Sequence, residues 1–463
     1  MKFVSTRKGI EATAHETILR GLAPDGGLFV PETGADCKVR DWSECATLGG
    51  ALGVALRTFF GDVSEECRAA TVQNVLAKFP AEDPIPLVDA DGFKILELFH
   101  GPTGAFKDVA LSALPVLMGE AARKGGAKKV LVLTATSGDT GSAAMAGFGG
   151  VDGVQVAVFF PETGTSRLQR LQMTTPADKN VHAIAIKGNF DDAQAAVKRI
   201  FADEKFRGEA AKAGINLSSA NSINTGRLVP QIAYYLYTAA RLGGRRFDVV
   251  VPSGNFGNIL AAWYAKKMGA NIGKFVCASN VNDVLARFIE TGTYDPGAKL
   301  TVTNSPSMDI LKSSNVERLL WLLNYGDGGE VARLMADLAN SGKYTLKPEA
   351  FARLREEFES ASATPEETEE EMRDVYERTG YVLDPHTAVA VRAARKRGYP
   401  KADACVVAAT ATPYKFPETC MRAYCKNLLT NPPAAFAALE TAPVTQNKVV
   451  EVAGIDDAVR ELL

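Results

Sequence analysis

The sequence predicts an α/β protein with mostly parallel sheets flanked by helices, preceded by a small, mainly helical N-terminal domain. Two observations lead to this class. From residue 92 onward, short apolar runs rich in Val, Ile and Ala alternate with longer amphipathic segments. The apolar runs also lack strict polar alternation, which is typical of strands covered on both faces. Strands that alternate with helices in this way form parallel sheets.

Six apolar runs are the expected strands. They are Lys129–Thr134, Val154–Phe160, Val181–Lys187, Phe247–Val251, Phe275–Ala278 and Ala404–Ala408. Because the pattern changes near residue 91, we expect an N-terminal domain over residues 1–90 and a core domain over residues 91–463. A smaller subdomain, at about residues 110–230, is expected to be inserted against the larger part of this core.

A Glu-rich segment between residues 356 and 378 is the clearest surface element. Thr364, Pro365 and Glu367 supply an N-cap, a proline in the first turn and a Glu three residues after the cap. Phe351, Leu354 and Phe358 recur at helical spacing before it. We expect a pair of surface helices whose charges face water.

The composition places the chain among globular proteins and excludes two classes of partner. Of its 463 residues, 46% are hydrophobic and 23% are charged. Lys and Arg number 52 against 54 Asp and Glu, and this net charge of −2 gives no basis for binding nucleic acid or an anionic membrane. No apolar run reaches the ~20 residues of a membrane-spanning helix, and we expect no signal peptide.

Cysteine usage indicates a reducing compartment. The seven cysteines are scattered, none forms a Cys-x-x-Cys pair, and the chain has only four histidines. We therefore expect no metal site and no disulfide framework, and a cytoplasmic location.

The first motif with chemistry runs from His100 to Asp108. A turn rich in glycine and proline places Lys107 where a helix over residues 109–119 begins. A phosphate-binding P-loop would need a glycine and a hydroxyl where Phe106 and Asp108 stand. A lysine beside an aromatic ring in a tight turn suits a Schiff-base amine, because desolvation lowers its pKa. Taken alone, the motif is equally compatible with a solvated lysine at a helix start.

The second motif lies where an apolar strand, 131–134, runs into hydroxyls and glycines. It comprises Ser137, Gly138, Asp139 and Thr140, just before a helix over residues 143–147. Backbone N–H groups and hydroxyls at a helix start bind a carboxylate or a phosphate. A simply capped helix is the alternative interpretation.

The third motif is a glycine loop after the strand 247–251. It comprises Ser253, Gly254, Asn255, Phe256, Gly257 and Asn258. Its Gly-x-x-Gly spacing is not the Gly-x-Gly-x-x-Gly pattern of dinucleotide sites, so a nicotinamide or flavin cofactor is not supported. A strand, a glycine loop and an apolar helix form a phosphate-binding loop. One reactive lysine and two anion sites together indicate a phosphorylated aldehyde cofactor and an anionic substrate.

These motifs belong to a set that spans nearly the whole chain. The set comprises residues 4–7, 26–31, 100–108, 136–141, 221–227, 253–257, 305–310 and 409–416. In these segments and their order, the chain resembles the longer bacterial and fungal branch of the threonine synthase family. Members of this family are fold type II (tryptophan-synthase-β-like) pyridoxal-phosphate enzymes.

The resemblance implies a role for each site residue. Lys107 would form the Schiff base with pyridoxal 5'-phosphate, and the Thr410 hydroxyl would meet the pyridine nitrogen. The cofactor phosphate would be surrounded by Gly254, Asn255, Phe256 and Gly257, and Ser253 and Asn258 would also belong to the cofactor-binding residues. Ser137, Gly138, Asp139 and Thr140 would hold the substrate carboxylate or shape its pocket. The substrate phosphate would be held by Asn221, Ser222 and Arg227.

The reaction implied is the last step of threonine biosynthesis. The enzyme would convert O-phospho-L-homoserine and water to L-threonine and phosphate, by γ-elimination and β-addition of water, and the resemblance favours a monomer. Two alternatives stay open, a serine or threonine dehydratase-like enzyme and a non-catalytic threonine-synthase-like binding protein. Asn258 and Thr412 depart from the family pattern, which often has an acidic residue and a histidine there. His100 and His386 are expected to be structural, the latter at a helix start.

Overall fold

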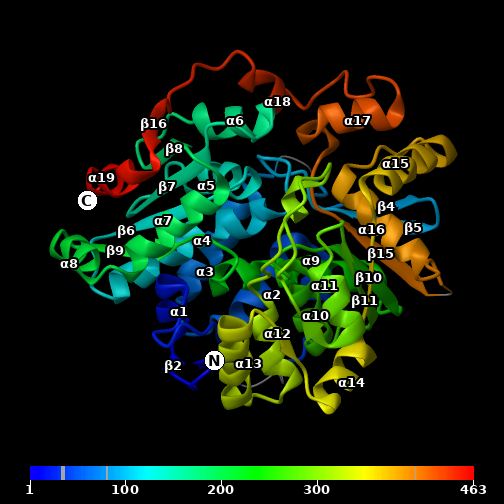
Figure 1. Ribbon diagram of the computed structural model, residues 1–463, viewed down its shortest axis with the longest axis horizontal. Coiled ribbons are helices and arrows are strands. Elements are labelled where there is room, and N and C mark those ends of the chain that lie inside the picture. Colours follow the sequence, from blue (N-terminus) through cyan, green and yellow to red (C-terminus); the bar gives the residue numbers. More distant parts are fainter. Residues whose placement is uncertain (33–36, 80–81, 402) are drawn as a thin grey trace.

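The computed structural model describes residues 1–32, 37–79, 82–401 and 403–463, and two large sheets organise them (Figure 1). The larger sheet has six strands in the order β14-β11-β10-β15-β5-β4. Its strands are β4 (Leu87–Ala90), β5 (Phe93–Glu97), β10 (Phe247–Pro252), β11 (Ile272–Ser279), β14 (Phe358–Ser362) and β15 (Ala404–Ala409). Every pair is parallel except β4 and β5, which form an antiparallel edge.

The smaller sheet is parallel throughout and has five strands in the order β16-β8-β7-β6-β9. Its strands are β6 (Lys129–Ala135), β7 (Val154–Pro161), β8 (Val181–Lys187), β9 (Ile215–Ser219) and β16 (Lys448–Glu451). The last strand comes from the C-terminal segment, drawn in red in Figure 1, which runs alongside β8. The predicted class, mostly parallel sheets flanked by helices, is confirmed.

All six predicted strands are present, with ends shifted by at most a few residues. The strands of the two large sheets that the sequence analysis missed are mostly short or at an edge. They are β4, β5, β9, β14 and β16. The division at residues 90 and 91 and the inserted subdomain remain predictions.

The helices flank the sheets and connect their strands (Figure 1). The helices that precede β10 in the sequence are α1 (Ala14–Arg20), α2 (Leu48–Phe59), α3 (Glu65–Leu76), α4 (Lys107–Lys124), α5 (Asp139–Phe148), α6 (Arg167–Thr174), α7 (Phe190–Ala202), α8 (Glu204–Lys212) and α9 (Thr225–Arg241). Those that follow are α10 (Gly257–Lys267), α11 (Val284–Thr291), α12 (Val316–Leu323), α13 (Gly328–Ser341), α14 (Pro348–Glu357), α15 (Pro365–Thr379), α16 (Pro385–Lys396), α17 (Pro417–Tyr424), α18 (Ala434–Leu439) and α19 (Ile455–Arg460).

The N-terminal region contains α1, α2 and α3 beside a small sheet. That sheet has the order β2-β1-β3, with β1 (Phe3–Ser5), β2 (Glu11–Ala12) and β3 (Phe29–Pro31). One further pair of strands, β12 (Thr293–Tyr294) and β13 (Tyr344–Thr345), lies apart from the large sheets.

The Glu-rich segment corrects one expectation. Helix α15 begins with the predicted capping box at Thr364. Phe358, however, does not continue a helix but opens strand β14, which pairs with β11. The expectation that the charges face water is wrong at Glu371, which is 1% exposed and accepts a hydrogen bond from Arg395 at 2.7 Å. Helix α15 packs against α16, and this contact turns one charged face inward.

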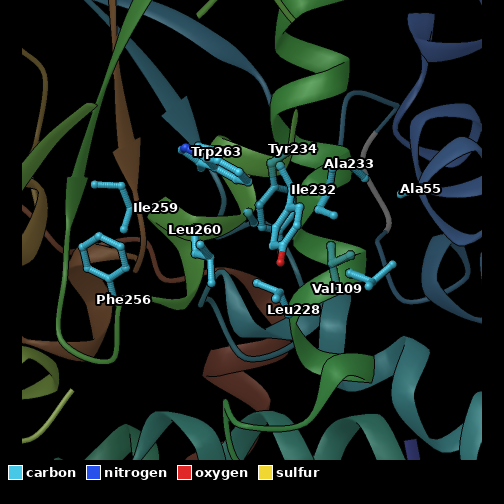
Figure 2. Close-up of a cluster of buried hydrophobic side chains, with 14 of the residues drawn as sticks. Ala55, Val109, Leu228, Ile232, Ala233, Tyr234, Phe256, Ile259, Leu260 and Trp263 are labelled. Carbon is cyan, nitrogen blue, oxygen red and sulfur yellow. The ribbon is translucent and has the colours of Figure 1, made fainter. Parts of the chain in front are cut away.

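A buried apolar cluster fixes the helices that carry the site (Figure 2). It joins Ala55 of α2 and Val109 of α4 to the inner faces of α9 and α10. Tyr234, Phe256 and Leu260 are at most 1% exposed within it. The first turns of α9 and α10 therefore rest on a packed base, which holds them in place.

Within the described ranges, no helix is long and apolar enough to cross a membrane.

Candidate active site

Lys107 is positioned by a turn that is fastened to the end of β15. The amide of Phe106 donates to the Thr410 carbonyl at 2.9 Å, and the amide of Thr412 donates to the Gly104 carbonyl at 2.9 Å. Gly104 has a φ of 70°, a left-handed conformation that favours glycine. The turn thus places Lys107 and Thr410 side by side at the carboxyl end of a central strand, where ligands bind in open α/β sheets.

The amine of Lys107 lies 3.2 Å from a carboxylate oxygen of Asp139, at the start of α5. This contact joins the first two motifs of the sequence analysis. Burial lowers the pKa of Lys107, and Asp139 opposes that shift. Burial alone would raise the pKa of Asp139, but Lys107 and Lys415 together hold it well below its usual range.

Asp139 is bonded to three further side chains, none of which sequence analysis placed in the site. Its Oδ1 accepts from Lys415 at 2.8 Å and from Gln169 at 2.9 Å. Its Oδ2 accepts from the Ser307 hydroxyl at 2.9 Å. Lys415 and Ser307 lie in segments that resemble the family, which was the only signal for them in the sequence.

A buried histidine, His386, accepts a hydrogen bond from the backbone of Ser307. The Ser307 amide donates to Nε2 of His386 at 3.1 Å, and Nδ1 of His386 lies 2.9 Å from Asp384. Since Nε2 accepts, Nδ1 carries the proton and donates to Asp384. His386 stands at the start of α16, as expected, and also orients a site residue. His100 instead hydrogen-bonds Glu97 at 2.7 Å.

The glycine loop after β10 leaves a row of free backbone donors. No described residue accepts a hydrogen bond from the amides of residues 254–257, at the start of α10. A Cβ on Gly254 would lie 2.8 Å from Ile310 Cδ1 and 3.3 Å from the Ser307 carbonyl oxygen, so a side chain there would require both neighbours to shift. Phe256 adopts a left-handed φ of 61° and turns its ring into the apolar cluster of Figure 2.

A second polar region adjoins this loop. The Ser314 hydroxyl donates to Asn255 Oδ1 at 3.2 Å and lies 3.1 Å from the Ser222 hydroxyl. Arg227, in the first turn of α9, is buried and donates to the Ala220 carbonyl at 2.5 Å. Its Nε has no hydrogen-bond partner among the described residues, and burial lowers its pKa to about 10. An unpartnered, buried guanidinium N–H is suited to an anion.

Family models match three parts of the chain. A model described as pyridoxal-phosphate dependent enzyme matches residues 79–411. Models of the threonine synthase N terminus and C-terminal part match residues 2–60 and 387–461. Threonine synthase from Pseudomonas aeruginosa is 39% identical over 430 residues, covering 91% of this chain and 90% of that protein. The chain belongs to the threonine synthase family.

Solved structures of threonine synthase family members have the same fold. The pyridoxal-phosphate-bound threonine synthase from Brucella melitensis is 36% identical, with a TM-score of 0.92 over 100% of this chain and 99% of that one. Yeast threonine synthase is 33% identical, with a TM-score of 0.90 over 99% and 98% of the two chains. The fold type II architecture and the dependence on pyridoxal phosphate follow for this chain.

The residues of the site fit that cofactor. Free amides at a helix start, beside a closely surrounded glycine, suit its phosphate. Thr410 is a buried residue whose hydroxyl makes no hydrogen bond to a described residue, and so is available to a ring nitrogen. Lys107 supplies the amine that the cofactor aldehyde requires.

The structure brings the predicted motifs together, with two qualifications. The side chain of Asn258 is bonded to Tyr235 and Gln231 of α9, so its amide group faces away from the loop. Ser137 is exposed, whereas Thr140 is half-buried. The cofactor and substrate contacts of the individual residues remain predictions.

Proposed function

We propose that this member of the threonine synthase family converts O-phospho-L-homoserine and water to L-threonine and inorganic phosphate. The observation that carries the proposal is Arg227, a buried guanidinium with an Nε that no described residue accepts from. Its charge influences the pKa of Lys107, so it lies near the reacting amine. A substrate with a distal phosphate accounts for this second anion site, whereas the substrates of dehydratases carry no such group.

The proposed roles follow from the geometry. Pyridoxal phosphate, when bound, supplies an electron sink for the electron pair left at the substrate Cα. Lys107 becomes a free base once the substrate amine has taken its place, and it removes the Cα proton. Ser137, Gly138, Asp139 and Thr140 surround the start of α5, where a carboxylate is stabilised by the backbone N–H groups.

The substrate phosphate is proposed to lie against Asn221, Ser222 and Arg227. Arg227 stabilises the charge that grows on the phosphate oxygen as its bond to Cγ breaks. Lys107 also removes a proton from Cβ, and water later adds to Cβ as a hydroxyl. The three protons released by Cα, Cβ and that water are returned to Cγ, Cα and the departing phosphate, so the reaction balances. Arg227 and Ser222 hold the leaving group away from bulk water until water adds at Cβ.

The direct test supplies O-phospho-L-homoserine to the purified protein and follows phosphate and threonine together. Equimolar appearance of both products is expected, with competitive inhibition by inorganic phosphate. If the protein converted L-serine or L-threonine to a keto acid but formed neither product from phosphohomoserine, it would be a dehydratase and the proposal would be wrong. Binding of phosphohomoserine without turnover would indicate a non-catalytic binding protein.

We also propose that the enzyme works in the cytoplasm as a monomer, without nucleic-acid partners. The near-neutral charge and the scattered cysteines of the sequence support the location and the absence of nucleic-acid partners, and the resemblance to the longer branch of the family supports the monomer. Light scattering coupled to gel filtration checks the assembly, and a mass of twice the 49.4 kDa of the chain would contradict it.

A further inference from the structure

Two buried amines share one carboxylate at the centre of the site. Asp139 Oδ1 lies 2.8 Å from the amine of Lys415, and Oδ2 lies 3.2 Å from the amine of Lys107. Lys415 is 0% exposed, while the Lys107 side chain is 14% exposed. A single carboxylate neutralises a single ammonium, so a second buried ammonium here would lack a counter-charge.

The hydrogen bonds favour Lys415 as the charged amine. An ammonium has three donors to satisfy. Lys415 donates to Asp139 and, at 2.9 Å, to the Thr103 carbonyl, which also accepts from Gln172. Lys107 has the longer contact with Asp139 and otherwise faces the Phe106 ring, 4.9 Å from its centroid, which attracts a cation more weakly than a carboxylate does.

The other charged groups near Lys107 do not supply a second negative charge. Arg227, from α9, adds a positive one. Asp108 lies in the first turn of α4, but its carboxylate accepts hydrogen bonds from Thr103 and Ala105. Among the described residues, no ion pair joins Asp108 to either lysine. Burial raises the pKa of Asp108, and the hydrogen bond from Thr103 and the charge of Lys415 oppose that shift.

We propose that Lys415 is a positioning residue that carries the positive charge paired with Asp139, so that Lys107 keeps a neutral, nucleophilic amine. In this arrangement Lys415 is the permanent counter-ion of Asp139, and Lys107 is the reactive amine. This inference concerns the Lys107 amine alone and does not depend on which amino acid is the substrate.

The experiment measures the protonation of Lys107 directly. Full-length protein is freed of cofactor with hydroxylamine, and its folding is verified by circular dichroism. A trace of acetic anhydride then labels amines over a range of pH, and mass spectrometry of the Lys107 peptide gives the pH of half-maximal reactivity. The wild type is compared with Lys415→Met, Asp139→Asn and, as a matched control, Lys78→Met. Lys78 is a partly buried lysine that donates to the Ala146 and Gly147 carbonyls.

Each variant has an expected direction. Lys415→Met leaves Lys107 as the partner of Asp139, so the labelling midpoint of Lys107 should rise by about 1 pH unit or more. Asp139→Asn removes the counter-charge, so the midpoint should fall. Lys78→Met should leave it unchanged. An unchanged or lower midpoint in Lys415→Met overturns the proposal, as does an equal rise in Lys78→Met.

A folding defect in Lys415→Met would shift the decision to Lys415→Gln, which also removes the charge but keeps a donor for Asp139 and Thr103. A higher midpoint in that variant supports the proposal, and an unchanged or lower one overturns it. No substrate enters these measurements, so failure of the phosphohomoserine assay and failure of this inference are separate results.

Discussion

Arg227 is the residue on which the choice of substrate is expected to depend. Its guanidinium is buried in the first turn of α9, and its Nε has no acceptor in the described part of the chain. A rigid planar fork binds phosphate through two parallel hydrogen bonds, which a lysine ammonium does not reproduce.

Arg227→Lys should therefore lower kcat/KM for O-phospho-L-homoserine by roughly 10- to 100-fold, because a hydrogen bond to a charged group is worth about 1.5–3 kcal/mol. Steady-state kinetics and inhibition by inorganic phosphate measure the effect. Arg245→Lys is the control, since Arg245 is exposed beyond the other end of α9. Wild-type kinetics in Arg227→Lys would remove Arg227 from the phosphate site.

Lys107→Ala should abolish turnover and the visible absorbance of the Schiff base, because the substitution removes the amine that forms it. A loss of general-base catalysis alone costs about 10²- to 10⁴-fold. Stopped assays and absorption spectra measure both effects. Lys124→Ala, at the exposed end of the same helix, should behave as wild type. Full activity without Lys107 would contradict the whole assignment.

At the scale of single residues, the sequence predicted which side chains belong to the site better than it predicted which side chains contact one another. Lys107 and Asp139 were each singled out from a local motif, since strand–turn–helix signals are local. Their contact with Lys415 was not predictable, because Lys415 is 276 positions beyond Asp139 (415 minus 139) and only the closed chain brings them together. The tautomer of His386 likewise depends on Ser307, from a distant segment.

Among the elements, the start of α10 combines free backbone donors with a closely surrounded glycine. Its free amides lie beside Gly254, where a Cβ would meet Ile310 and the Ser307 carbonyl. Ser307 also bonds Asp139, so a shift of the loop would disturb the Lys107 region as well.

Gly254→Ala should weaken pyridoxal-phosphate binding, since overpacking costs about 1–3 kcal/mol. Titration of cofactor-free protein with pyridoxal phosphate, followed by absorbance, measures the change. Gly208→Ala is the control, because Gly208 lies inside α8 with open space at its Cβ position. Equal affinity of Gly254→Ala and the wild type for pyridoxal phosphate would show that the loop accommodates a Cβ at this position.

The strands were predicted where an apolar run is continuous, and they were missed where pairing with other strands decides the structure. The central strands of both sheets are continuous apolar runs, and all of those predicted are present. Phe358 shows the opposite case. Its spacing from Leu354 is helical, yet it pairs with Phe275 of β11 and is fully buried. Tertiary contacts override local spacing in so short a strand.

For the whole molecule, Glu120 connects the N-terminal region to the core. This residue of α4 lies 3.0 Å from the His15 ring of α1 and accepts from the Ser64 amide, at the start of α3, at 2.8 Å. Burial alone would raise the pKa of Glu120, but hydrogen bonds from Ser64 and His15 lower it to about 2.

The stability that Glu120 contributes should therefore be lost over a defined range of acid pH. A carboxyl whose pKa falls from 4.5 to about 2 on folding stabilises the protein fully above 4.5 and loses that contribution as the pH falls to about 2. Urea denaturation at several pH values measures the slope. In Glu120→Gln the free energy of unfolding should fall less steeply over this interval, and parallel curves would contradict the assignment.

Strand β16 has a consequence for how the protein is made. Strand β8 ends at Lys187, and its outer neighbour does not begin until Lys448. On the ribosome, β6, β7, β8 and β9 emerge long before Lys448–Glu451 is made, so one edge of β8 stays unpaired until that segment arrives. An open edge is a template for pairing with another nascent chain. The separation of β8 and β16 along the sequence thus sets the interval of synthesis in which the edge of β8 is open to such pairing.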